Sequence, residues 1–91
     1  MYEITDYTKQ RAKEYGVQVR PSTNKKKKID VFRNGEKIAS IGASGYGDYP
    51  SYIQQYGNEY ADERRRLYHI RHRRNIEQTG SPGFWAGVLL W

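Results

Sequence analysis

The sequence contains no cysteine, so it can form neither a disulfide framework nor a thiolate metal site. Aliphatic side chains are scarce, because valine, isoleucine and leucine together number only 14. The longest apolar stretch, FWAGVLLW, is far shorter than the roughly 20 residues that a membrane-spanning helix needs. Charged residues interrupt the N-terminal segment, and we therefore expect neither a membrane span nor a signal peptide. We expect one small domain, residues 1–91, that depends on aromatic contacts.

Positive charge is abundant and unevenly placed. The net charge is +6, and residues 20–37 hold seven bases against Asp30 and Glu36. Residues 58–78 hold six arginines against four acids. Such a balance favours acidic partners, either phosphate backbones or acidic protein surfaces, and it does not choose between them.

Local patterns predict a small α+β fold. In residues 1–27, Thr5 or Asp6 begins a short helix that Gly16 follows, and a basic loop comes after it. Residues 28–41 alternate around Asn34-Gly35, the pair preferred in a type I′ turn, and predict a β-hairpin. The hairpin needs a cover, and we expect the helix 58–78 to supply it.

The region 48–78 reads as helical. Asp48 precedes a Tyr-Pro pair and predicts the start of a short helix that Gly57 ends. Asn58 then caps a longer helix that runs to about Gln78. Residues 79–91 form an apolar tail with a helical turn or two.

The arginine-rich helix predicts buried charge. Arg64 and Arg71 fall on the same side as the apolar Tyr60, Leu67 and Tyr68. A guanidinium on a buried face needs a partner, which can be a carboxylate, a backbone oxygen or a phosphate. We expect carboxylates or backbone oxygens, and the first candidates among the acids are Asp48 and Asp6.

The other arginines predict surface contacts. Arg65 and Arg66 follow Asp62 and Glu63 by one turn and predict ordinary surface pairs. Arg73 and Arg74 have no such acid in the preceding turn and are candidates for a protein interface.

Two further groups allow alternative interpretations. The run Lys25, Lys26, Lys27 and Lys28 predicts a solvated loop or a polyanion contact. Tyrosines recur at positions 46, 49, 52, 56 and 60, a spacing that suits core packing or the stacking of bases.

The apolar tail is the main candidate for contact with another protein. Its large side chains either fold back on the small core or dock on a partner chain. We assign the protein interface to the following tail residues: Phe84, Trp85, Leu89, Leu90 and Trp91.

No catalytic or metal-binding pattern is present. His69 and His72 are three residues apart, but the flanking arginines oppose a cation and no nucleophile motif lies nearby. The stretch GASGYG matches no phosphate-binding loop. We expect no enzymatic activity, no metal, no cofactor and no small-molecule substrate.

Several segments resemble a known group of proteins. KKIDVF, IGASGYGDYPSYI, ERRRLYHIRH and GSPGFWAGVLLW resemble small proteins of large nucleocytoplasmic DNA viruses of algae and protists (chlorovirus- or mimivirus-like). The resemblance implies a viral accessory protein and supplies no catalytic residues.

Together these features favour a minor capsid component. Such a protein is made inside the host cell and, in many copies, cements neighbouring capsid proteins in the virion. The alternative is a basic virion protein that binds genomic DNA weakly and without sequence preference.

Overall fold

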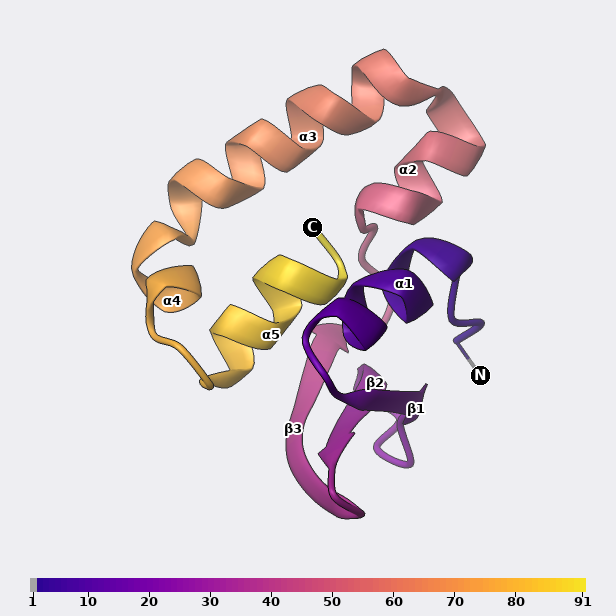
Figure 1. Ribbon diagram of the computed structural model, residues 1–91. Coiled ribbons are helices and arrows are strands. Elements are labelled where there is room, and N and C mark those ends of the chain that lie inside the picture. The colour runs from indigo at the N-terminus through magenta and orange to yellow at the C-terminus, as the bar shows by residue number, and fades with distance from the viewer. Residues whose placement is uncertain (1) are drawn as a thin grey trace.

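The computed structural model describes residues 2–91 and confirms the predicted α+β class (Figure 1). Its elements follow in the order α1 (Asp6–Glu14), β1 (Gln18–Pro21), β2 (Lys27–Arg33), β3 (Glu36–Ala43), α2 (Tyr49–Tyr56), α3 (Asn58–Arg71), α4 (Arg73–Glu77) and α5 (Pro82–Leu89). The three strands form one antiparallel sheet in the order β1-β2-β3. In Figure 1, α2, α3 and α4 form an arc on the far side of α5 from the sheet. None of the helices within residues 2–91 combines the length and the apolar character needed to cross a membrane.

The predicted hairpin is confirmed in β2 and β3. Ile29 lies opposite Ile41, and Val31 lies opposite Ala39. Asn34 and Gly35 have φ angles of 53° and 78°, the left-handed values that a type I′ turn requires at both central positions. The additional strand β1 pairs with β2 and ends at Pro21, a position at the sheet edge that tolerates a missing N–H.

Helix α5, rather than helix 58–78, covers the hairpin, so the predicted packing partner was wrong. Contacts join α5 to β3 and to α1, whereas α3 contacts chiefly α2 and α4. Ile29 and Ile41 of the sheet meet Leu89 and Leu90 in the core, and all four are at most 2% exposed. The segment PGFWAGVL carries no charge, so its burial removes apolar surface from water without desolvating an ion.

Helix α1 is joined to the end of α5. The Thr5 side chain caps α1 by accepting the Thr8 N–H. The Thr8 hydroxyl donates to the Leu89 carbonyl at 2.9 Å, and Arg11 Nε donates to the Val88 carbonyl at 2.9 Å. These bonds satisfy carbonyls at the C-terminus of α5 that have no partner within the helix. The N-terminal segment is therefore part of the core.

The predicted continuous helix from Asn58 to about Gln78 is wrong in its cap and in its continuity. Gly57, with φ 88°, occupies the cap position, and Asn58 is the first helical residue. The helix stops at Arg71, and α4 begins after His72. The break turns α4 toward α5, where a Cβ added to Gly87 would lie 2.6 Å from Ile76 Cγ1. Ile76 of α4 therefore packs closely on Gly87 of α5, where a larger residue would not fit.

Candidate functional site

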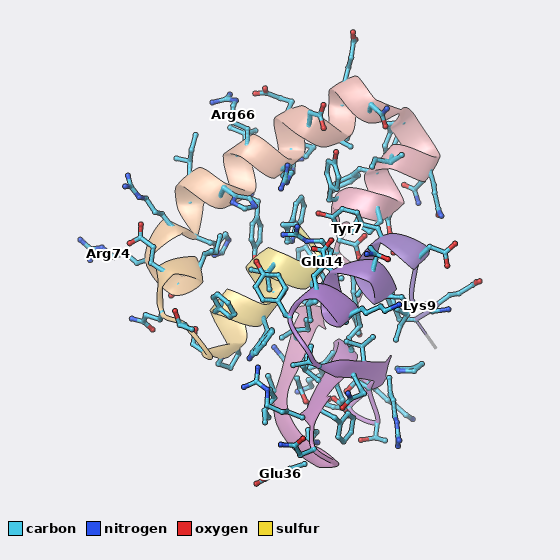
Figure 2. All side chains as sticks on the ribbon, viewed as in Figure 1. Tyr7, Lys9, Glu14, Glu36, Arg66 and Arg74 are labelled. Carbon is cyan, nitrogen blue, oxygen red and sulfur yellow. The ribbon has the colours of Figure 1, made fainter. Side chains whose placement is uncertain are left out.

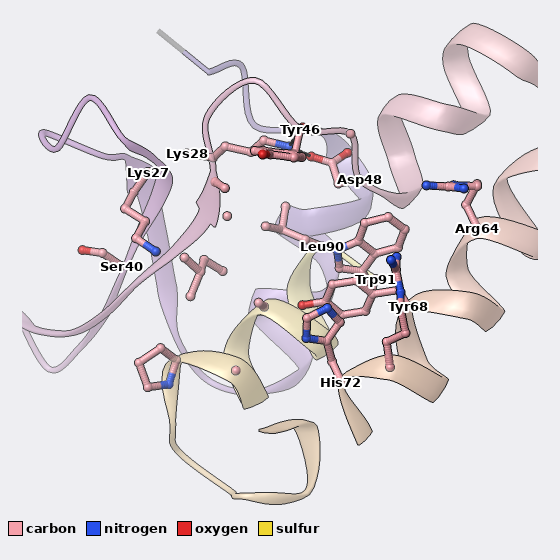
Figure 3. Close-up of a pocket in the computed structure, with 18 of the residues that line it drawn as sticks. Lys27, Lys28, Ser40, Tyr46, Asp48, Arg64, Tyr68, His72, Leu90 and Trp91 are labelled. Carbon is pink, nitrogen blue, oxygen red and sulfur yellow. Dashed lines mark hydrogen bonds and ion pairs between the residues drawn. The ribbon is translucent and has the colours of Figure 1, made fainter. Parts of the chain in front are cut away.

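A groove of about 490 Å³ lies where β3, α2, α3 and α5 come together (Figure 3). In Figure 3, Lys27 and Ser40 lie on the sheet side, while Arg64, Tyr68 and His72 project from the opposite wall. The charged lining consists of four cations and one carboxylate: Lys27, Lys28, Arg64, Arg71 and Asp48.

Lys28 and Asp48 form a buried ion pair in the wall of this groove. Lys28 Nζ lies 2.9 Å from Asp48 Oδ2, and the two side chains are 7% and 1% exposed. Lys28 Nζ also donates to the Tyr46 carbonyl, and the Tyr2 hydroxyl donates to Asp48 at 2.8 Å. Asp48 additionally accepts the Ser51 N–H at 3.0 Å and so caps α2, as predicted. The pair therefore ties β2, the N-terminal segment and the start of α2 together.

The electrostatics of this pair leave Asp48 ionised. Burial by itself would raise the pKa of Asp48, but hydrogen bonds from Lys28 and Ser51, with the Lys28 charge, outweigh burial and lower that pKa below its ordinary value. Burial and the neighbouring Asp48 charge raise the pKa of the Tyr2 phenol. Asp48 is thus a carboxylate at neutral pH, and Lys28 cancels its charge.

The other three cations of the groove lack an acidic partner in the part of the chain that the structure describes. Within residues 2–91, Lys27, Arg64 and Arg71 form no ion pair. The Arg64 guanidinium lies over the Tyr52 ring, 5.8 Å from its centroid, and Lys27 and Arg71 are exposed. Because the single carboxylate is already neutralised, the groove presents a net positive field that favours an anionic ligand.

Aromatic rings stand beside these cations. The Tyr68 ring stacks on Trp91 with a centroid distance of 4.4 Å and on His72 at 4.3 Å. Burial raises the pKa of Tyr68, so this phenol is neutral at physiological pH. Tyr46 lies at the rim and is 75% exposed. Cations interleaved with aromatic faces are typical of surfaces that bind single-stranded nucleic acid.

A second cavity, of about 770 Å³, continues the groove. It shares Lys27 and Lys28 with the first and reaches the loop of residues 22–25. The buried Asp30 holds this loop, because its Oδ1 accepts hydrogen bonds from the Ser22 and Ser40 hydroxyls, both at 2.7 Å. Burial alone would raise the pKa of Asp30, but these hydrogen bonds outweigh it and lower the pKa. The two cavities form one basic track from the lysine loop to α3.

The predicted buried ion pairs of Arg64 and Arg71 are wrong. Arg71 is exposed and Arg64 is half-buried. Asp48 binds Lys28 instead, and Asp6 is exposed in the first turn of α1.

The reason is that only part of the apolar side of α3 packs on the body. Ala61 is fully buried, whereas Tyr60 and Ile70 are 44% and 60% exposed. Arg64 and Arg71 lie along this boundary and line the groove.

The lysine run divides between two environments. Lys28 is 6% exposed and paired with Asp48, so a polyanion contact is wrong for this residue. Lys25, Lys26 and Lys27 are exposed, and for them the contact remains a prediction. Lys28 points to the side of the strand that the loop around Tyr46 covers, while its neighbour Lys27 points away from that cover.

The tail folds back on its own chain, one of the two predicted alternatives. Trp85, Leu89, Leu90 and Trp91 are at most 9% exposed, and Phe84 packs edge-on against Tyr15 at 6.0 Å. The assignment of Trp85, Leu89, Leu90 and Trp91 to a partner interface is therefore wrong, because they belong to the buried core, whereas Phe84 is half-buried and its predicted interface role stays a prediction.

The remaining arginines differ from one another. Arg66 pairs with Glu63, as predicted, and Arg73 pairs with the following Glu77 at 3.0 Å. Arg65 departs from its predicted partner, because its Nε donates to the Trp91 carbonyl. Arg74 is exposed and, like Arg66, projects outward from the arc (Figure 2), so its predicted role in an interface stays a prediction.

The two histidines also have different surroundings. Burial and the charges of Arg65 and Arg11 lower the pKa of His69, while His72 belongs to the ring stack. Within the part of the chain that the structure describes, no three His, Cys, Asp or Glu side chains group together as a metal site would need.

Sequence reasoning missed Tyr46, Tyr68 and His72 as residues of one groove. A signal existed for two of them, because positions 64, 68, 71 and 72 fall on one stripe of a helix. No local pattern shows that the loop with Tyr46 faces this stripe.

Comparison with known proteins gives one partial match. A model described as "Family of unknown function (DUF5754)" matches residues 17–51, which span β1, β2, β3 and the start of α2. The matched segment includes Lys27, Lys28, Tyr46 and Asp48 of the groove. Neither a curated protein nor a solved structure matches the chain. The segment from the sheet to the cap of α2 is thus similar to this family of unknown function.

Proposed function

We propose that this chain is a non-enzymatic virion protein of a large DNA virus that binds genomic nucleic acid through its basic track, without sequence selectivity. One observation carries the proposal. Three cations, Lys27, Arg64 and Arg71, line the same groove, and none of them forms an ion pair with a carboxylate within residues 2–91. The viral setting rests on the resemblance of the sequence motifs.

The distribution of charge agrees with contacts to phosphates. Lys25 extends the positive track beyond the groove, and it and its neighbour Lys26 are both exposed. Side chains on phosphates fix position and affinity without reading sequence. Such binding is weak and depends strongly on salt, because each contact releases a counterion.

Binding can be tested by fluorescence anisotropy with a labelled oligonucleotide at several salt concentrations. With about four phosphates contacted, log K falls against log salt with a slope of about −3.6 for a duplex or about −2.8 for a single strand. The double variant Arg64→Gln/Arg71→Gln should weaken binding and flatten this slope.

The matched control removes the same charge elsewhere. Lys9, which Figure 2 shows on α1, and Lys13 are exposed and do not line the groove, so Lys9→Gln/Lys13→Gln should change affinity much less. Equal losses in the two double variants would contradict a site at the groove. Sequence-selective binding at physiological salt would contradict the absence of base reading.

A minor capsid component is the second candidate, now with a different contact surface. Tyr56 of α2 and Tyr60 of α3 lie ring to ring at 4.6 Å and are 62% and 44% exposed, and Ile70 near the C-terminal end of α3 is 60% exposed. These exposed side chains, with Arg74 of α4, suit contact with a neighbouring capsid protein better than the buried tail does.

Purified particles separate the two candidates. After high-salt stripping, mass spectrometry should find a capsid component with the shell and a genome-binding protein with the released DNA. The variant Tyr56→Ser/Tyr60→Ser should abolish incorporation into particles if the exposed edge is an assembly surface.

A further inference from the structure

We infer that the groove binds a single strand in preference to a duplex, with the Tyr46 ring as a stacking platform for a base. This inference rests on the proposed function, since it names which form of nucleic acid the same groove accepts. Three observations support it: Tyr46 is exposed, the groove has the size of a small-ligand pocket, and positive charge continues past Lys27.

Tyr46 is an aromatic residue that the fold holds in place without burying. Its carbonyl accepts a hydrogen bond from the buried Lys28, and its N–H donates to the Ala43 carbonyl at 3.3 Å. Its ring is nevertheless 75% exposed, and its hydroxyl donates to no other group within residues 2–91. A fixed backbone with an exposed ring is poor core packing but a good stacking surface, because every base has a flat face.

The groove has the size and lining for an unpaired nucleotide. Its volume of about 490 Å³ is within the range of pockets that enclose small ligands. Tyr68 and His72 stand on the wall opposite the Tyr46 loop, and Arg64 and Arg71 bring positive charge to that wall (Figure 3). A duplex keeps its bases stacked inside and offers only their edges. It therefore cannot place a base in this recess.

Positive charge continues beyond the groove, as binding of a strand rather than of a free nucleotide would require. The second cavity meets the groove at Lys27 and leads to the exposed Lys25. A chain of phosphates can pass along these lysines while one base turns toward Tyr46. A mononucleotide would leave the lysine end unoccupied.

The experiment compares a labelled thymidine 20-mer with a 20-base-pair duplex at the same low salt concentration. We expect the single strand to bind at least about tenfold more tightly. Tyr46→Ala should weaken single-strand binding about fivefold or more, which corresponds to the lower end of measured base–aromatic stacking. Tyr46→Phe should retain the wild-type affinity, because the ring does the stacking.

Tyr56→Ala is the matched control, since Tyr56 is 62% exposed and lies outside the lining of the groove. It should leave both affinities unchanged, and circular dichroism should show that all variants are folded. Equal binding of the two forms, or no effect of Tyr46→Ala, would overturn the inference and leave the proposed function standing. If neither the single strand nor the duplex binds at low salt, both the inference and the proposed function are overturned.

Discussion

Helix α5 and helix α3 differ in how deeply their side chains are buried against the rest of the protein. Helix α5, with the residues that follow it, is the most apolar segment, and its Leu89 and Trp85 are buried in the core. Helix α3 carries three consecutive arginines, and only Ala61 is buried in it. In a chain with few aliphatic residues, apolar density decides what is buried, whereas a cluster of cations can remain without acidic partners.

The same contrast separates two adjacent lysines. Lys28 is buried beside Asp48, and Lys27 is exposed without an acidic partner within residues 2–91. The difference comes from strand alternation and from the loop that covers one side of β2. Positive charge in this chain therefore has two roles, one structural and one available for a ligand.

The largest effect should come from the same substitution made in the two helices. Leu89→Ala removes a fully buried side chain from the core, and a Leu→Ala change at such a site costs about 2–5 kcal/mol. A domain of this size has little stability to lose, so the variant should be largely unfolded. Urea denaturation followed by circular dichroism measures this effect.

Leu67→Ala is the paired control on α3. Leu67 is half-buried, and its truncation should cost clearly less. If the two variants are equally destabilised, α3 contributes as much as α5 to the core and the comparison fails.

The buried ion pair should give the next largest effect. Lys28→Met leaves the Asp48 carboxylate buried without its cation, and breaking such a pair costs about 3–5 kcal/mol. Adding Asp48→Asn should restore part of the loss, because asparagine is neutral and still caps α2. Thermal unfolding of the single and double variants tests this, and an additive loss in the double variant would contradict the pairing.

The pH dependence of stability follows from the same carboxylate. The pKa of Asp48 is lower in the folded chain than its ordinary value, and Asp30 shows the same direction. Both groups bind protons more weakly when folded, so they stabilise the fold above the unfolded pKa of about 3.9. This contribution is lost as the pH falls below that value through the folded pKa. Wild type should therefore lose stability steeply in this range.

Lys28→Met/Asp48→Asn provides the control for that pH dependence, because it lacks one of the two carboxylates. Its melting temperature should fall less between pH 5 and pH 3 than that of the wild type does. An identical fall would show that Asp48 does not titrate with folding.

Much of the fold follows from local sequence signals. Asn34-Gly35 predicted the hairpin, Asp48 predicted the start of α2, and Thr5 predicted the cap of α1. These features depend on a few neighbouring residues and on turn or cap geometry, which sequence reports directly.

The packing of these elements against one another was harder to predict from the sequence. The apolar arc of α3 predicted that Arg64 lies on a buried face. A helical-wheel projection shows which residues share a face, but it does not show which part of that face packs against the rest of the protein. The break at His72 accompanies a close contact between Ile76 of α4 and Gly87 of α5, two residues on different helices. The groove arises from four elements together, so its residues could not be assembled from local patterns alone.

The smallest effect on stability should come from a change at Arg71, which the sequence pattern predicted to be buried. Arg71→Gln removes an exposed cation that forms no ion pair within residues 2–91, and substitutions at such sites usually change stability by less than about 0.5 kcal/mol. The same variant should weaken oligonucleotide binding and make it less sensitive to salt, because a cation of the groove is lost. Arg66→Gln is the paired control, since Arg66 is equally part of α3 but projects outward and pairs with Glu63. Urea denaturation and anisotropy on both variants separate the two roles. A marked loss of stability in Arg71→Gln would show that this arginine supports the fold, and unchanged binding would remove it from the site.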